Sequence, residues 1–187
     1  MEESSYVANY NFSLSYLKSN QKDAAGEALE SALAQVPENE KNGNNPVYLS
    51  ILLLLAFLGL EKNDFERVAR YAEEGLAVKK DHADLLFVKS LLLMDLKRFD
   101  EMLEALIHYL LALDAVDREK FDYKYTGEAA LKEVYYSLLP VACKNAFEFG
   151  KMRDITQRLC KATGSEWLKK ACEVMDKVAG VRSDKEN

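Results

Sequence analysis

The sequence contains few of the residues on which metal sites and catalytic sites depend. It has two histidines, His82 and His108, which lie 26 residues apart with no further ligand at helical spacing. Its three cysteines, Cys143, Cys160 and Cys172, have no paired spacing and no local activating group. Zinc sites need three or four clustered ligands, and a nucleophilic cysteine needs a neighbouring base or positive charge. No glycine-rich phosphate loop is present either. We therefore expect no metal, no cofactor and no enzymatic activity.

The sequence also has no excess of positive charge and no long apolar run. The formal net charge is −6, and no basic cluster appears, which argues against nucleic acid as a partner. The most apolar run, Val47–Leu60, has 14 residues, fewer than the roughly 18 to 20 that a membrane span needs. The first residues, Met1–Ser5, do not resemble a signal peptide. With unpaired cysteines, these features predict a cytoplasmic protein without a membrane span.

Glycine and proline are rare as well, with 8 and 3 copies among 187 residues. Leucine, alanine, glutamate and lysine dominate instead, and these residues favour helix. The composition therefore predicts an all-α chain. Its length and its hydrophobic fraction of 49% suit one domain or one stack of helices.

One stretch of the chain repeats itself 34 residues later. Phe65 follows a short polar turn, and Phe99 follows a similar turn at the same place in the next unit. The apolar pattern agrees on both sides of these turns, in the pairs Leu52 and Leu86, Ala56 and Ser90, Leu60 and Met94, Val68 and Met102, and Leu76 and Leu110. A period of 34 with helices on both sides of a turn is the spacing of tetratricopeptide repeats.

The repeat alignment divides the chain into helix pairs. The first pair aligns on the second with an offset of 43, so nine extra residues fall in the polar connection 37–45. A second insertion, 115–127, precedes the last pair. The predicted units are four helix pairs at 6–37, 46–80, 81–114 and 128–163, a C-terminal capping helix at 165–179 and a tail at 180–187.

The fourth pair carries two helix-breaking signals. We predict a long first helix at 128–149 with a kink at Pro140, or a helix start near it, because proline removes a backbone donor. The segment Gly150–Asp154 is then predicted as the turn to the second helix.

The four pairs resemble tetratricopeptide repeats with some departures. The resemblance implies a right-handed superhelix of antiparallel helix pairs, with each pair stacked on its neighbours. The turn aromatic of the family is kept at Phe65 and Phe99 but is replaced by Lys22 and Met152 in the outer pairs. The first-helix glycine of the family is replaced throughout, by Ser13, Ala56, Ser90 and Cys143.

A narrower resemblance covers residues 78–149. The junction Val78–Phe87 and the insertion that ends in Tyr125–Ala129 look similar to repeat regions of bacterial family-2-type glycosyltransferases. This resemblance implies an accessory, non-catalytic region of such an enzyme. The chain contains no βαβ alternation and no Asp-x-Asp motif after a strand, so no transferase activity is assigned to it.

The first helices of stacked pairs line an inner, concave groove. The predicted groove residues occupy three alignment positions that point away from the partner helix, and they are Tyr10, Leu14, Leu17, Leu53, Phe57, Leu60, Phe87, Leu91 and Met94. Of these, Tyr10, Leu14, Leu53, Phe57, Phe87 and Leu91 are the principal candidates for protein binding. The set is apolar, so the basic clamp with which some repeat proteins hold a peptide carboxylate is absent.

An open apolar groove is unusual on a monomer, and three explanations remain open. The groove receives an apolar or amphipathic segment of a partner, or the chain's own terminal segments or tight curvature close it, or it forms a homodimer interface. The insertion is a second candidate contact, through Phe121, Tyr123 and Tyr125, unless these rings pack over the adjoining helices.

These patterns predict a non-enzymatic protein-interaction module with an apolar groove. Two alternatives remain: the accessory region of a bacterial glycosyltransferase, and a chaperone of the secretion type, because such small acidic repeat proteins hold apolar segments of their clients.

Overall fold

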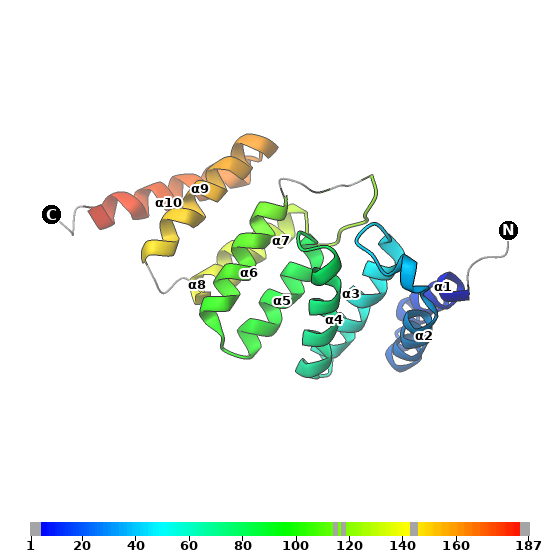
Figure 1. Cartoon of the computed structure of the whole chain (residues 1–187). Coiled ribbons are helices and arrows are strands. Elements are labelled where there is room, and N and C mark those ends of the chain that lie inside the picture. The colour runs from blue at the N-terminus through cyan, green and yellow to red at the C-terminus, as the bar shows by residue number, and fades with distance from the viewer. Residues whose placement is uncertain (1–4, 114–115, 117–118, 143–145, 184–187) are drawn as a thin grey trace.

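The structure, a computed structural model, describes residues 5–113, 116, 119–142 and 146–183 (Figure 1). Every regular element in these ranges is a helix, so the expectation of an all-α chain is confirmed. No helix within these ranges has the length and apolarity needed to cross a bilayer.

Six helices form three hairpins that lie side by side in chain order (Figure 1). They are α1 (Ser5–Lys18), α2 (Lys22–Gln35), α3 (Pro46–Glu61), α4 (Phe65–Val78), α5 (Ala83–Asp95) and α6 (Phe99–Ala112), with a short 3₁₀ helix, Glu38–Glu40, after α2. Within each hairpin the first helix packs along the second, and α2 and α4 also contact the first helix of the next hairpin.

The three hairpin turns have the same backbone structure. Asn20, Asn63 and Lys97 adopt positive φ angles of 57°, 55° and 58°. In each turn the following N–H donates to a carbonyl five residues earlier, as in the bond of 2.9 Å from Asp64 to Gly59. This is the Schellman motif, which ends a helix by satisfying its last carbonyls. The positive-φ residues are spaced by 43 and 34, the two offsets of the sequence alignment.

Side-chain caps begin α3, α4 and α5. The Asn45 side chain accepts the N–H groups of Val47 and Tyr48, and Pro46 occupies the first turn of α3, where a missing donor costs nothing. Asp64 caps α4 through its carboxylate. His82 caps α5, and its Nδ1 accepts the Leu85 N–H at 3.3 Å.

The core consists of two clusters of buried residues that both include residues of α5, and it contains three deeply buried tyrosines, Tyr48 and Tyr71 in one cluster and Tyr109 in the other. Small residues allow the close approach of neighbouring helices. A Cβ added at Gly59 would lie 2.8 Å from Val68 on α4, and one added at Gly75 would lie 2.4 Å from Leu85 on α5. The hydrophobic α3 is consequently buried on most of its circumference.

The fourth helix pair differs from the sequence prediction. It consists of α7 (Glu128–Glu133), a π-helical turn (Val134–Leu138), α8 (Leu139–Ala142) and α9 (Ala146–Thr163), and α10 (Glu166–Ser183) follows. The expected turn Gly150–Asp154 is therefore wrong, because these residues lie inside α9. A single exposed glycine costs a helix only about 1 kcal/mol, which neighbouring packing offsets. The described part of the first helix ends at Ala142 instead of residue 149, and Cys143 lies outside the described residues.

Irregularity near Pro140 takes the form of a π turn. The Leu139 N–H donates to Val134, five residues back, in the turn that precedes the proline. Such π turns appear where the regular hydrogen-bond ladder is interrupted, and proline supplies no donor to continue it.

The C-terminal helix begins as the sequence indicates and ends later. Gly164 has a positive φ of 64°, and Ser165 accepts the Leu168 N–H as a cap. Helix α10 packs on α9 and continues to Ser183. The expected helix end at residue 179 is therefore wrong, and residues 180–183 belong to the helix instead of to a tail. Residues 184–187 of the predicted tail lie outside the described ranges.

Candidate functional site

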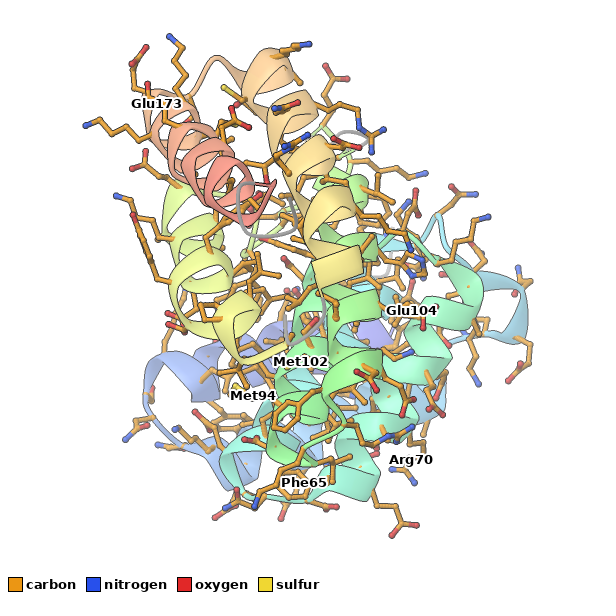
Figure 2. All side chains as sticks on the ribbon, turned by 90° about the vertical axis from the view of Figure 1, so that its left-hand side faces the viewer. Phe65, Arg70, Met94, Met102, Glu104 and Glu173 are labelled. Atoms are coloured by element: carbon orange, nitrogen blue, oxygen red, sulfur yellow. The ribbon has the colours of Figure 1, made fainter. Side chains whose placement is uncertain are left out.

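The predicted groove residues lie on α1, α3 and α5. We call the surface that they form the first-helix face, and it consists of Tyr10, Leu14, Leu17, Leu53, Phe57, Leu60, Phe87, Leu91 and Met94. Leu53 and Phe87 are 8% and 4% exposed, and the other seven are half-buried. Figure 2 shows Met94 on the side of α8, with Arg70 and Glu104 of the second helices on the opposite side.

The second insertion lies against this face. We call residues 119–127 the strap. The ring of Tyr125 stacks on Phe87, with centroids 4.2 Å apart and planes inclined by 5°, and lies parallel to Phe57 with centroids 5.8 Å apart. Two of the six principal groove residues therefore already contact an aromatic side chain of the chain itself.

Buried polar groups hold the main chain of the strap. The two carboxylate oxygens of Asp84 accept the backbone N–H groups of Lys124 at 2.8 Å and Tyr125 at 2.7 Å. The Tyr109 hydroxyl donates to the Tyr125 carbonyl at 2.5 Å. Asp84 is 1% exposed, so these hydrogen bonds are shielded from water. The peptide units on both sides of Tyr125 are thus held at the first-helix face.

The aromatic rings at the other end of the strap surround His82. Its ring lies edge-on to Tyr123 at 4.9 Å and to Phe121 at 5.9 Å. Phe121 is 6% exposed, so it packs over the helices instead of facing solvent. The sequence left two alternatives for these rings, a contact with a partner or packing over the adjoining helices. Phe121 packs over the helices, and the half-buried Tyr123 and Tyr125 contact the same helices.

Lysines add contacts along the strap. The Lys120 ammonium donates to the Asn44 side chain at 2.8 Å, which ties the strap to the connection before α3. The Lys124 ammonium lies 5.2 Å from the Phe57 ring centroid, and that of Lys79 lies 5.0 Å from the Phe121 centroid. These distances suit cation–π attraction.

Burial shifts the pKa values of the two titratable groups beneath the strap in opposite ways. It raises the pKa of the Asp84 carboxyl, although the N–H groups of Lys124 and Tyr125 oppose the rise. It lowers the pKa of His82 to about 4, and the positive charge of Lys79 acts in the same direction. His82 is therefore neutral at pH 7, as its role as a hydrogen-bond acceptor requires.

The described residues include no cluster of side chains that could hold a metal ion. No group of three or more His, Cys, Asp and Glu side chains is placed to hold an ion in these ranges. Asp84 and His82 both engage backbone N–H groups. Cys160 and Cys172 are free thiols, and burial first, then Cys160, raises the pKa of Cys172 to about 11. A thiol with so high a pKa is a poor nucleophile at neutral pH.

Sequence reasoning did not identify Asp84, His82 and Tyr109 as parts of this site. One signal was present in the sequence: Asp84 is a lone acid at the start of the otherwise apolar run Ala83–Val88. A buried carboxylate needs hydrogen-bond donors, and the strap supplies them.

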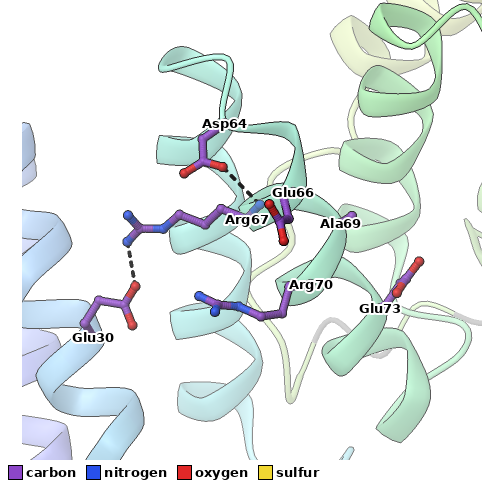
Figure 3. Close-up of a pocket in the computed structure, with 7 residues that line it drawn as sticks. All are labelled: Glu30, Asp64, Glu66, Arg67, Ala69, Arg70 and Glu73. Carbon is purple, nitrogen blue, oxygen red and sulfur yellow. Dashed lines mark hydrogen bonds and ion pairs between the residues drawn. The ribbon is translucent and has the colours of Figure 1, made fainter.

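A pocket of about 660 Å³ lies between the second helices α2 and α4, on the side of the hairpins opposite the first-helix face (Figure 3). Its charges are mixed. Arg67 pairs with Glu30 at 2.7 Å, and the buried Tyr71 hydroxyl donates to Glu30 at 2.5 Å while accepting from Arg70. These bonds join the first two hairpins and indicate a structural role for the cluster.

No protein-family model matches the chain, and neither a curated protein nor a solved structure matches it. Its function must therefore be inferred from its own residues and contacts.

Proposed function

We propose that the protein is a non-enzymatic tetratricopeptide-like module whose first-helix face binds an apolar or amphipathic segment of another protein. One observation carries this proposal: the face already holds a non-helical segment of its own chain, the strap, through ring stacking and main-chain hydrogen bonds. A surface that accommodates such a segment in cis has the shape and chemistry to bind one in trans.

Repetition of the backbone supports the tetratricopeptide-like part of the proposal. Three hairpins share one turn structure at Asn20, Asn63 and Lys97, and they lie side by side in chain order. Helix pairs of this length that repeat in register stack into a superhelix. The first helices then share one face, which is the face that carries the apolar residues.

Half-buried apolar side chains support the binding part of the proposal. Tyr10 and Leu14 on α1 extend the face beyond the strap contacts on Phe57 and Phe87, and Leu91 extends it along α5. Apolar side chains that stay partly in water gain free energy when a partner covers them, at about 25 cal/mol for each Å² removed from water.

Site-specific photo-crosslinking tests the proposal. A photoreactive residue at Leu14 or Leu91 should capture a partner from the source cell through defined peptides, identified by mass spectrometry. The same residue at Glu66 or Glu104, on the second helices, serves as the control and should not capture it.

Charge substitution supplies the matched affinity test. Leu14→Glu and Leu91→Glu should weaken the crosslinked partner at least about tenfold, which corresponds to 1.4 kcal/mol. Leu111→Glu, at an exposed leucine of α6, should leave the affinity unchanged. The proposal fails if Leu14→Glu and Leu91→Glu bind as wild type does, or if they unfold the protein as a charge in the core would. Crosslinks only between two copies of this chain would instead identify a homodimer interface.

A further inference from the structure

The strap meets the first-helix face with alternate residues. Phe121, Tyr123 and Tyr125 contact the helices, whereas Asp122 and Lys124 between them have exposed side chains. The strap forms no helix or strand and bends at Lys124 and Tyr125, and in this conformation its three rings reach one surface. The helices in turn present a set of residues that receives them.

The polar contacts of this set are made to main-chain atoms. Asp84 accepts two consecutive backbone N–H groups, and Tyr109 donates to a backbone carbonyl. Every peptide carries these groups, so the contacts hold a bent main chain without selecting its sequence. Selection comes from the rings, which meet Phe57, Phe87 and His82.

We propose that His82, Asp84, Phe87, Phe57 and Tyr109 form a peptide-binding slot that takes a non-helical partner segment with aromatic residues at alternate positions, bent as the strap is, in place of the strap. This inference rests on the proposed function and names the part of the face and the class of ligand. The strap is the intramolecular occupant of the slot, and a partner must displace it.

Charge adds a second element to the ligand. Lysines flank the rings of the strap, with the Lys124 ammonium over Phe57 and the Lys120 ammonium on Asn44. The protein has a net charge of −6, which favours the approach of a basic segment. The expected partner segment therefore interleaves aromatic residues with lysine or arginine.

The tether of the strap sets the affinity that a partner needs. A segment of the same chain competes at an effective concentration of about the millimolar range, so the strap competes strongly with a free peptide. A free peptide with the sequence of the strap should bind weakly to the wild-type protein and more tightly once the strap is removed. The ratio of the two dissociation constants determines the fraction of the time for which the strap occupies the slot in the wild-type protein.

A labelled synthetic peptide with the sequence of residues 119–127 tests the inference by fluorescence anisotropy. The receptor is the full chain in which residues 119–126 are replaced by a Gly-Ser linker of equal length. We expect saturable binding at least about tenfold tighter than to wild type. Asp84→Asn in the same background should weaken binding about tenfold or more, whereas Leu111→Glu, on the exposed side of α6, should leave it unchanged. A peptide with the same composition but three adjacent aromatics is the control and should bind at least tenfold more weakly.

Hydrogen exchange on the intact chain keeps the test independent of the linker variant. In wild type the Lys124 and Tyr125 amides should be protected, and excess peptide should speed their exchange. Tyr125→Ser, which removes one ring and leaves the helices unchanged, should bind the peptide more tightly than wild type does.

The inference is overturned if the peptide binds neither folded variant, if the control peptide binds equally well, or if excess peptide leaves the protection of the two amides unchanged. The strap would then be a fixed structural element. Crosslinking of a partner at Leu14 or Leu91 would still stand in that case, so failure of the slot is distinguishable from failure of the proposed function.

Discussion

Asp84 and Tyr125 are 41 residues apart in the sequence and are joined by a hydrogen bond of 2.7 Å, in which the buried carboxylate accepts the backbone N–H. This contact positions the strap on the first-helix face. Asp84 lies in the first turn of α5, so the contact ties this helix to the strap, and the same carboxylate also accepts the Lys124 N–H.

Asp84→Asn should release the strap. The asparagine side chain has one accepting oxygen where the carboxylate has two, so one of the two backbone N–H groups loses its partner. A buried donor without a partner costs about 1–3 kcal/mol. We expect the free energy of unfolding, measured by urea denaturation at pH 7, to fall by that amount, and trypsin to cleave faster at Lys120 and Lys124. Asp122→Asn, at an exposed acid of the strap, is the matched control and should change stability by less than about 0.5 kcal/mol. Equal stability of Asp84→Asn and wild type would show that the carboxylate does not hold the strap.

Acid should destabilise the protein through His82. Because the folded pKa of about 4 lies below the ordinary value of 6.5, the unfolded chain binds a proton over this interval while the folded protein does not. The His82 contribution to stability is complete above pH 6.5 and declines by about 3 kcal/mol as the pH falls to 4. Lys79 opposes protonation, and Asp81 favours it.

Comparison with His82→Asn isolates this effect. Asparagine is a good helix cap that does not titrate, so the variant keeps the acceptor for the Leu85 N–H. The raised pKa of Asp84 acts with the opposite sign, since the folded state binds that proton more readily, but it is present in both proteins. The difference between the two proteins in unfolding free energy should therefore move with pH, and His108→Asn, at an exposed histidine, should behave as wild type. Parallel pH profiles of wild type and His82→Asn would contradict the prediction.

Lys97→Gly should stabilise the third hairpin turn. Lys97 holds a φ of 58°, which costs a residue with a Cβ about 1 kcal/mol, and glycine avoids this cost. Glycine also has more freedom in the unfolded chain, so we expect a net gain of about 0.5 kcal/mol in unfolding free energy, read from thermal melting. Lys97→Ala keeps the Cβ and should melt as wild type does. A loss of stability in Lys97→Gly would mean that the lysine side chain contributes contacts that outweigh its backbone strain.

Gly43→Ala should destabilise the connection between the first two hairpins. An added Cβ would lie 2.4 Å from the Val78 carbonyl oxygen at the end of α4, and a backbone atom cannot move aside without shifting the helix end. Overpacking of this kind costs about 1–3 kcal/mol. Gly127→Ala is the matched control, because it lies in the other insertion with no atom within 4 Å of the added Cβ. Chemical denaturation of the two variants should differ by at least 1 kcal/mol, and equal stabilities would show that the 37–45 connection adapts freely.

The hairpins were predictable because their signals are local. The echo of Phe65 in Phe99 marks a turn whose backbone depends on a few consecutive residues, and the turns recur at the offsets of the alignment. The break in the last pair was misplaced for a related reason. Gly150 resembles a turn locally, but a helix tolerates one glycine when its neighbours are good helix formers.

The apolar first-helix residues also followed from the sequence, since helical periodicity places residues such as Phe57 and Leu91 on the same face in each repeat. The insertion has no periodicity, and Tyr125 has no local partner that would indicate where it packs. Its place depends on Asp84 and Tyr109, which reach it only after α5 and α6 have packed together.

The sequence by itself determined the helical content, the register of the three hairpins and the apolar character of their shared face, because propensity, turn chemistry and periodicity act over short distances. Only the tertiary structure decided that part of this face is covered by the chain's own residues 119–127. The physical reason is that a buried carboxylate needs donors, and folding brings those of Lys124 and Tyr125 to Asp84 from 40 and 41 residues away.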